Sequence, residues 1–402
     1  MTKVLVIGGL TSVGRHIVTL LVPTYGMHVG GLVRVVDEKL PRASYLSRQH
    51  LRAFDAADFR QVNMSNPSAI EAAFSLPDGE TFDWVINCSS TADDWEVEEV
   101  HRQRFIVRPA MWARQARASG AKVYVHMSTA IFYKEYYDKN GEPVRCNEAC
   151  AMEGTTLKGR YTLRMESELR EIQGLPLIVV RPAVLWGPEE MGLFGTMLIG
   201  SDIFSRIKKT WVLASTKNIR YSLAHVVDVA RAMIHLAEWY VREEIQGIVT
   251  YNISDLSPGR AEETLKAYQQ VFPDFHYRVV GNTPKSQLPS PSASKALVSR
   301  NNDIIQEHWL FLLKDHHIND SPLLPYIDLE YGMFRNIYVD GTAIIRDTGF
   351  SYLHDQGITK EDIIDIIHGY MDRGIWPRRP LGDEADTSAH SNEDDKSSFK
   401  HR

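Results

Sequence analysis

The strongest constraint on the fold is a short apolar run near the start of the chain, followed at once by glycines. Val4–Ile7 is apolar and mostly β-branched, which is typical of a buried strand. Gly8 and Gly9 interrupt it, and apolar residues at helical spacing follow at Val13, Ile17, Val18 and Leu21. A strand, a glycine turn and a helix in this order begin a dinucleotide-binding unit, because the helix N-terminus offers free N–H groups to a pyrophosphate.

The glycines of this loop have separate roles on that interpretation. Gly8 permits the tight turn, and Gly14 lets the helix pack closely on the strand. The plainer alternative is an ordinary strand, turn and helix with incidental glycines. The loop residues predicted to bind the cofactor are Gly8, Gly9, Thr11, Ser12, Val13 and Gly14.

The end of the second predicted strand bears on which dinucleotide is bound. Residues 28–36 are apolar and rich in β-formers, and Asp37 follows them. An acidic residue about 20 residues after the glycine loop is where this fold places its ribose ligand, so Asp37 favours NAD over NADP. If the strand ended at Val33, Arg34 would lie at its tip and would suit a 2′-phosphate, which keeps NADP as the alternative.

Strands and helices keep alternating, which indicates an α/β fold with a parallel sheet and helices on both faces. Further strands are predicted at residues 59–63, 83–88, 122–127 and 175–180. Their carboxyl ends add Asn63 near an adenine, and Cys88 and Ser89, whose small side chains let a cofactor lie close to the backbone. Pro182, just past the last of these strands, completes the predicted cofactor-binding set.

The pattern predicts a Rossmann-type doubly wound sheet with a smaller C-terminal domain. The NAD(P)-binding domain covers residues 1–188 and is completed by about 216–255. Residues 189–215 and 256–377 form the predicted smaller domain. Residues 378–402 are polar and charged, so we expect a disordered tail.

Composition narrows the partners and the compartment. The net charge of −6 gives no reason to expect nucleic acid or a membrane surface, and no apolar run is long enough to span a bilayer. The first strand leaves no room for a signal peptide, and three cysteines suggest a reducing compartment, so a cytoplasmic protein is expected. Cys146 and Cys150 would face each other on a helix, but no further ligands accompany them and no metal is expected.

Four stretches together resemble the extended short-chain dehydrogenase/reductase family, the NAD-dependent epimerases and dehydratases. They are the Gly8 to Gly14 loop, Ser128-Thr129-Ala130-Ile131-Phe132-Tyr133, Arg181-Pro182 with Trp186-Gly187-Pro188, and His225-Val226-Val227-Asp228. The resemblance implies a Rossmann domain, a nicotinamide cofactor and a small-molecule substrate, often a nucleotide sugar. It also implies that the smaller domain, residues 189–215 and 256–377, is the substrate-binding domain. One departure is Thr11, which stands at the middle glycine of the family pattern and narrows the space for the pyrophosphate.

The resemblance also implies a catalytic tyrosine, a lysine one helical turn later and a serine or threonine after the fifth strand. Thr129 fits the last position. Aligning Glu166 with the family's acidic residue puts Lys158 at the tyrosine position and Thr162 at the lysine position, so the pair is altered. Tyr161 is the other candidate for the proton, although a tyrosine packed against the sheet is the simpler interpretation. The catalytic candidates are therefore Thr129, Tyr161 and Lys158.

His225 and Asp228 fall in a predicted strand-to-helix turn. One interpretation is a contact to substrate or to the loop around Gly187. The other is a helix cap by Asp228 beside a structural histidine.

Two functional interpretations follow. In the first, the protein is an NAD(P)-dependent oxidoreductase or epimerase acting on a small hydroxyl or carbonyl metabolite, such as a nucleotide sugar. In the second, it is a catalytically impaired NAD(P)-binding pseudoenzyme that serves as a sensor or scaffold. The resemblance also suggests a homodimer formed by the helices around Trp112 and Leu163.

Overall fold

The computed structural model describes residues 2–22, 31–90, 96–216, 219–281, 291–327 and 335–382. The chain divides into two compact units. The first comprises Met1–Glu189, Arg220–Gly259 and Asn336–Gly357, and the second comprises Glu190–Ile219, Arg260–Arg335 and Ile358–Arg402.

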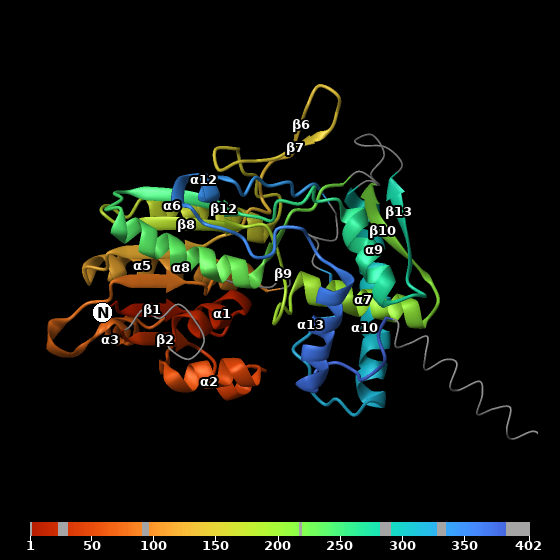
Figure 1. Cartoon of the computed structure of the whole chain (residues 1–402), viewed down its shortest axis with the longest axis horizontal. Helices are drawn as coiled ribbons and strands as arrows, with labels where there is room; N and C mark the ends of the chain where they lie inside the picture. The colour runs from red at the N-terminus through yellow and green to blue at the C-terminus, as the bar shows by residue number, and fades with distance from the viewer. Residues whose placement is uncertain are drawn as a thin grey trace, which may run out of the picture. The chain divides into compact units, whose positions relative to one another are not determined.

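The first unit is built on a seven-stranded parallel sheet with the order β12-β8-β5-β4-β1-β2-β3. The order steps outward in both directions from β1, which confirms the doubly wound Rossmann-type fold (Figure 1). The strands are β1 (Val4–Ile7), β2 (Val33–Asp37), β3 (Asp58–Gln61), β4 (Trp84–Asn87), β5 (Val123–Met127), β8 (Leu177–Pro182) and β12 (Ile248–Ile253).

Helices cover both faces of this sheet. One face packs its core on α3 (Pro67–Phe74), α5 (Arg108–Ala118) and α6 (Leu157–Arg170), with Trp112 fully buried among them. The opposite layer contains α1 (Ser12–Leu21), which packs against α2 (Arg48–Ala56) and α8 (Val226–Arg242). A short helix α4 (Glu98–His101) and a π-helical stretch Arg102–Val107 lead into α5.

Two small sheets and a late segment complete the first unit. β9 (Val184–Trp186) pairs in parallel with β11 (Leu223–His225), and β6 (Tyr136–Tyr137) pairs antiparallel with β7 (Pro143–Val144). The segment 336–357, with α12 (Ala343–Thr348), belongs to this unit, whereas the sequence pattern assigns it to a C-terminal domain. Backbone bonds explain this placement, because Ser222 donates to Ile337 and Ile337 donates to Arg220.

The second unit contains α7 (Leu193–Arg206), β10 (Thr210–Thr216), α9 (Ala261–Val271), β13 (His276–Gly281), α10 (Pro291–Asp315) and α13 (Lys360–Asp372). β10 and β13 form a parallel pair. Trp309 and Trp376 are buried and pack with ring centroids 5.2 Å apart. A Thr359–Asp362 capping box starts α13.

Several local predictions change in the structure. Residues 28–30 lie outside the described residues, and the second strand runs from Val33 to Asp37. Cys146–Cys150 is a turn and not a helix. Of the predicted tail, residues 378–382 are described: Arg379 pairs with Asp202, and Gly382 donates to the Val271 carbonyl. Among the described residues, no helix is both long and apolar enough to cross a membrane.

Candidate functional site

The glycine loop between β1 and α1 is tightly constrained by its surroundings. Gly8 has a φ of +77°, and a Cβ there would lie 2.8 Å from the Ser89 Cα. A Cβ on Gly9 would lie 2.2 Å from the Val35 side chain, and one on Gly14 would lie 2.3 Å from the Gly8 carbonyl oxygen. All three positions therefore require glycine, and the incidental-glycine alternative does not fit.

Thr11, at the family's middle glycine position, caps α1. Its hydroxyl donates to the Gly8 carbonyl at 2.9 Å and accepts from the Gly14 N–H at 3.1 Å. The side chain is thereby held inside the loop. Within the described residues, the N–H groups of Ser12 and Val13, at the first two positions of α1, have no protein acceptor. These N–H groups suit the pyrophosphate of a dinucleotide.

Asp37 ends β2, as the sequence predicts. Its carboxylate accepts from the Leu10 N–H at 3.0 Å and from the Lys39 N–H at 3.1 Å. Burial raises the pKa of Asp37, although these N–H bonds oppose the shift. The carboxylate is thus tied directly to the glycine loop, which is the position expected of a ribose ligand.

Arg34, the alternative residue that would bind the 2′-phosphate of NADP, bonds other groups of the protein. It is the second residue of β2 and pairs with Asp58 at 2.7 Å. Its guanidinium also donates to the carbonyls of Ala73 and Ser75 and lies over the Phe82 ring. With 3 % of its surface exposed, Arg34 is a structural residue, and the contact to a 2′-phosphate that the sequence left open is wrong.

The remaining candidates for the cofactor differ in position. Ser89 follows β4 and bonds Asn87 through its N–H and its hydroxyl. The Cys88 side chain is fully buried against Met233 of α8, and burial raises the pKa of its thiol, so only its backbone is available. Asn63 is an exposed turn residue two positions beyond β3, where its side chain accepts from the Ser65 N–H.

The carboxyl ends of β5 and β8 meet at Thr129 and Pro182. The Pro182 carbonyl accepts from the Ala130 N–H at 2.8 Å and from the Thr129 hydroxyl at 3.4 Å. The Thr129 bond is long and therefore weak, which leaves its hydroxyl able to turn to another acceptor. Thr129 is half-buried at this edge.

Lys158 lies in the first turn of α6, which starts at a Thr156 cap. This turn packs on the segment that follows β5, because a Cβ on Gly159 would lie 3.0 Å from the Phe132 ring. The structure therefore brings the Lys158 turn and the Thr129 segment together. Thr162, one turn further along α6, is buried.

Tyr161 is directed to another part of the unit. Its hydroxyl donates to Glu98 of α4 at 3.0 Å, and its ring lies 6.3 Å from that of His101. Desolvation and the Glu98 bond raise the pKa of Tyr161. Tyr161 is therefore held as a protonated phenol that donates to Glu98.

A buried ion pair behind this edge was not recognised from the sequence. Arg181 of β8 binds Glu166 of α6 through two bonds, at 2.5 and 2.9 Å. Ser128 donates to the same carboxylate at 2.6 Å, and Arg181 donates to the Tyr133 hydroxyl at 2.8 Å. Burial opposes the charge on Glu166, but Arg181 outweighs it and lowers the pKa of that carboxyl. The pair holds the residues on either side of Thr129 and Pro182 in place.

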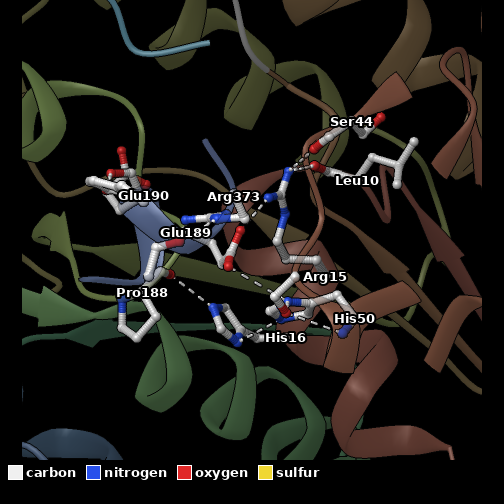
Figure 2. Close-up of polar contacts among 12 residues, drawn as sticks. Leu10, Arg15, His16, Ser44, His50, Pro188, Glu189, Glu190 and Arg373 are labelled. Atoms are coloured by element: carbon white, nitrogen blue, oxygen red, sulfur yellow. Dashed lines mark hydrogen bonds and ion pairs between the residues drawn. The ribbon is translucent and has the colours of Figure 1, made fainter. Parts of the chain in front are cut away.

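A second buried network supports the glycine loop (Figure 2). Arg15 pairs with Glu189 at 2.8 Å and donates to the Leu10 carbonyl at 2.7 Å, and Arg15 and Glu189 side chains are each 6 % exposed. His16 contacts the Pro188 carbonyl at 3.0 Å, and His50 contacts His16 at 3.4 Å. The glycine loop is therefore held at Leu10 both by Asp37, which accepts from its N–H, and by Arg15, which donates to its carbonyl.

His225 lies against the loop around Gly187, as one of the two interpretations predicts, because a Cβ on Gly187 would lie 2.7 Å from His225 Nε2. The predicted helix cap is made by His225 and not by Asp228. His225 is the N-cap of α8, whereas Asp228 accepts from the N–H groups of Leu353 and His354. Among the described residues, the ligand atoms of His225, Asp228 and His354 lie within 4.8 Å of one another, a spacing that suits a metal ion. However, the Asp228 carboxylate already bonds Arg231 and His354. The imidazole rings of His225 and His354 are stacked with their centroids 3.5 Å apart, so one ion cannot lie in the plane of both rings.

Comparison with known proteins defines the class. A model of the NAD dependent epimerase/dehydratase family matches residues 4–254, which is more than half of the chain, and the chain belongs to that family. The match spans the glycine loop, Asp37, Thr129 and Pro182, and NAD is the cofactor of the family. No curated protein matches the sequence significantly.

Solved structures show the same fold. UDP-glucose-4-epimerase from Stenotrophomonas maltophila with bound NAD and formylated UDP-arabinopyranose is 16 % identical, with 93 % of this chain and 99 % of that chain covered and a TM-score of 0.63. The Bordetella bronchiseptica enzyme WbmG in complex with NAD and UDP is 13 % identical, covers 93 % and 96 %, and has a TM-score of 0.60. At such identities the likeness concerns the fold.

Proposed function

We propose that this chain binds NAD along the carboxyl edge of its sheet and acts on a small hydroxyl or carbonyl metabolite, with nucleotide sugars as the first class to test. The observation that carries the proposal is the loop itself: two N–H groups at the start of α1 that have no acceptor among the described residues, beside a carboxylate that ends β2. Family membership supports the same assignment, as do the structurally similar enzymes that bind NAD together with UDP or a UDP-sugar.

The residues that hold the cofactor follow from this arrangement. The N–H groups of Ser12 and Val13 bind the pyrophosphate, and Asp37 accepts from the adenosine ribose. Gly8 lies against Ser89, so the loops that follow β1 and β4 are in close contact. Bound NAD supplies a hydride acceptor, and the protein supplies position and proton transfer.

Proton transfer falls to Lys158, with Thr129 as the donor that orients the substrate oxygen. Lys158 is assigned this role because its turn of α6 packs on the segment that follows β5. Thr129 gives up its weak bond to the Pro182 carbonyl and donates to the substrate instead. Tyr161, bound to Glu98, takes no part.

The first experiment is a titration of the protein with NADH and NADPH, followed by nicotinamide fluorescence and thermal shift. We expect saturable binding of NADH and a loss of affinity of about tenfold in Asp37→Asn, the equivalent of about 1.4 kcal/mol. Asp55→Asn, an exposed position on α2, is the matched control and should bind as the native protein does. Absence of NADH binding would overturn the proposal.

The second experiment tests chemistry. UDP-sugars are screened with NAD, and substrates that turn over are repeated with Lys158→Met, Thr129→Ala and Tyr161→Phe. We expect the first two to lose turnover by 10²–10⁴-fold, as for removal of a general acid/base, and the third to stay near the native rate. NADH binding without turnover of any hydroxyl or carbonyl substrate would leave a binding protein and refute the catalytic assignment. Neither the family nor the structural neighbours support the inactive sensor or scaffold considered from the sequence.

A further inference from the structure

The function proposed above makes no use of α10, a 25-residue helix of the second unit. One side of α10 is buried, where Ile305 is 0 % and Trp309 is 1 % exposed. On the other side, Leu310 and Phe311 are 65 % and 63 % exposed. Single exposed apolar side chains are common on protein surfaces, but two large neighbours at this exposure form a patch that suits a partner.

Two charged residues flank this patch on the same exposed stripe of α10. Glu307 lies one turn before Leu310 and Phe311, Lys314 lies one turn after them, and both side chains are exposed. Residues seven apart on a helix are separated by about 10 Å, which is too far for a direct ion pair. Within the part of the chain that the structure describes, neither side chain has a hydrogen-bond or ion-pair partner. From the N-terminal to the C-terminal end, the stripe therefore presents an unpaired acid, two apolar side chains and an unpaired base.

An open hollow of about 630 Å³ adjoins the patch. Ile203 and Ile207 line it together with Phe311 and Leu312 of α10, and Lys314 lies at the same hollow. Because apolar side chains from two segments line it, the hollow can take an apolar side chain of a partner and remove that side chain from water.

We propose that a second copy of this chain covers the stripe, through an antiparallel α10–α10 contact about a two-fold axis between Leu310 and Phe311. In a two-fold interface, residue i of one protomer contacts residue j of its partner, and j contacts i. Glu307 and Lys314 are equally far from this axis along α10, so the rotation places each of them opposite the other across the interface, twice. Leu310 of one protomer then lies against Phe311 of its partner, beside the hollow.

The charge pattern selects this partner. Reversed end to end, the stripe is complementary to itself, and self-complementarity is what an interface between identical copies requires. The stripe belongs to the second unit, so the interface differs from the one around Trp112 and Leu163 that the sequence suggests. The proposal does not depend on the binding of NAD.

Analytical ultracentrifugation of the full chain over a range of concentrations tests the patch. We expect the native protein to form a dimer that dissociates on dilution. Leu310→Glu and Phe311→Glu should each weaken the dimer by about 30-fold or more, because each buries a charge at the centre of the interface. Val97→Glu changes a side chain of the first unit that is 68 % exposed, and this control should dimerise as the native protein does.

Exchange of the two charges tests the antiparallel pairing itself. Glu307→Lys and Lys314→Glu each place like charges opposite each other at both contacts, so each variant alone should dimerise about tenfold more weakly at low salt. Mixed in equal amounts, the two variants should form a heterodimer, and the double variant should dimerise as the native protein does, because opposite charges then meet at both contacts. Asp365→Lys, at an exposed position of α13, is the charge control and should have no effect.

A native protein that stays monomeric at every concentration would overturn the proposal. A dimer that survives Leu310→Glu and Phe311→Glu would place the interface elsewhere, and charge variants that fail to pair when mixed would refute the antiparallel arrangement. A monomer that dimerises only after residues 383–402 are removed would identify that segment as the occupant of the stripe and would equally overturn the proposal.

Discussion

Replacing Arg181 by methionine is expected to destabilise the sheet unit more than any exposed charge substitution. Arg181 makes two bonds to Glu166, whose surface is 4 % exposed, so the variant leaves a buried carboxylate without its cation. Loss of one partner from a buried pair costs about 3–5 kcal/mol. Arg170→Met is the matched control: Arg170 approaches the same carboxylate at 3.6 Å but is 36 % exposed, and its loss should cost about 0–1 kcal/mol.

Urea denaturation at pH 7 measures both variants, with hydrogen exchange of the β5 and β8 amides to localise the loss. The double variant Glu166→Leu with Arg181→Met removes both charges, so it should be more stable than the sum of the single losses predicts, by about 2–3 kcal/mol. A loss below about 1 kcal/mol in Arg181→Met, or strict additivity in the double variant, would refute the view that Arg181 exists to neutralise Glu166.

Three further outcomes are expected. Gly14→Ala should abolish NADH binding and lower the melting temperature, because the added Cβ would lie 2.3 Å from the Gly8 carbonyl oxygen. The control Gly369→Ala has open space around the added Cβ and should change neither property. Equal effects of the two variants would argue against the close packing of the loop. Thr11→Gly should leave NADH affinity equal or higher while loosening α1, as amide exchange would report, and lost binding would show that the Thr11 hydroxyl is needed. His16 and His126 have pKa values lowered by burial from 6.5 to about 4, so the stability they contribute is complete above pH 6.5 and is lost as the pH falls towards 4. The urea midpoint should fall between pH 7 and pH 5 and fall less in His126→Leu, and an identical slope in that variant would contradict this.

Short-range features of the sequence were sufficient to predict the parallel sheet and the glycine loop between β1 and α1. Apolar runs and glycine breaks report local conformation, and the loop glycines and Asp37 act within one strand-turn-helix unit or between adjacent strands. The positions of Gly8, Gly9, Gly14 and Asp37 therefore agree with the prediction, although their part in cofactor binding stays a proposal.

Side-chain partners over long separations required the folded chain. Glu189 reaches Arg15 across 174 positions, and residues 336–357 return to the first unit through bonds to Arg220 and Ser222. The sequence leaves Arg34 as the alternative to Asp37, because its position on β2 depends on pairing with β1 and β3. It leaves Tyr161 as a candidate base, because the Glu98 partner of Tyr161 lies on another helix. Hydrophobic periodicity in the sequence predicts which residues are buried. The partners of those side chains depend on how elements far apart in the sequence pack together.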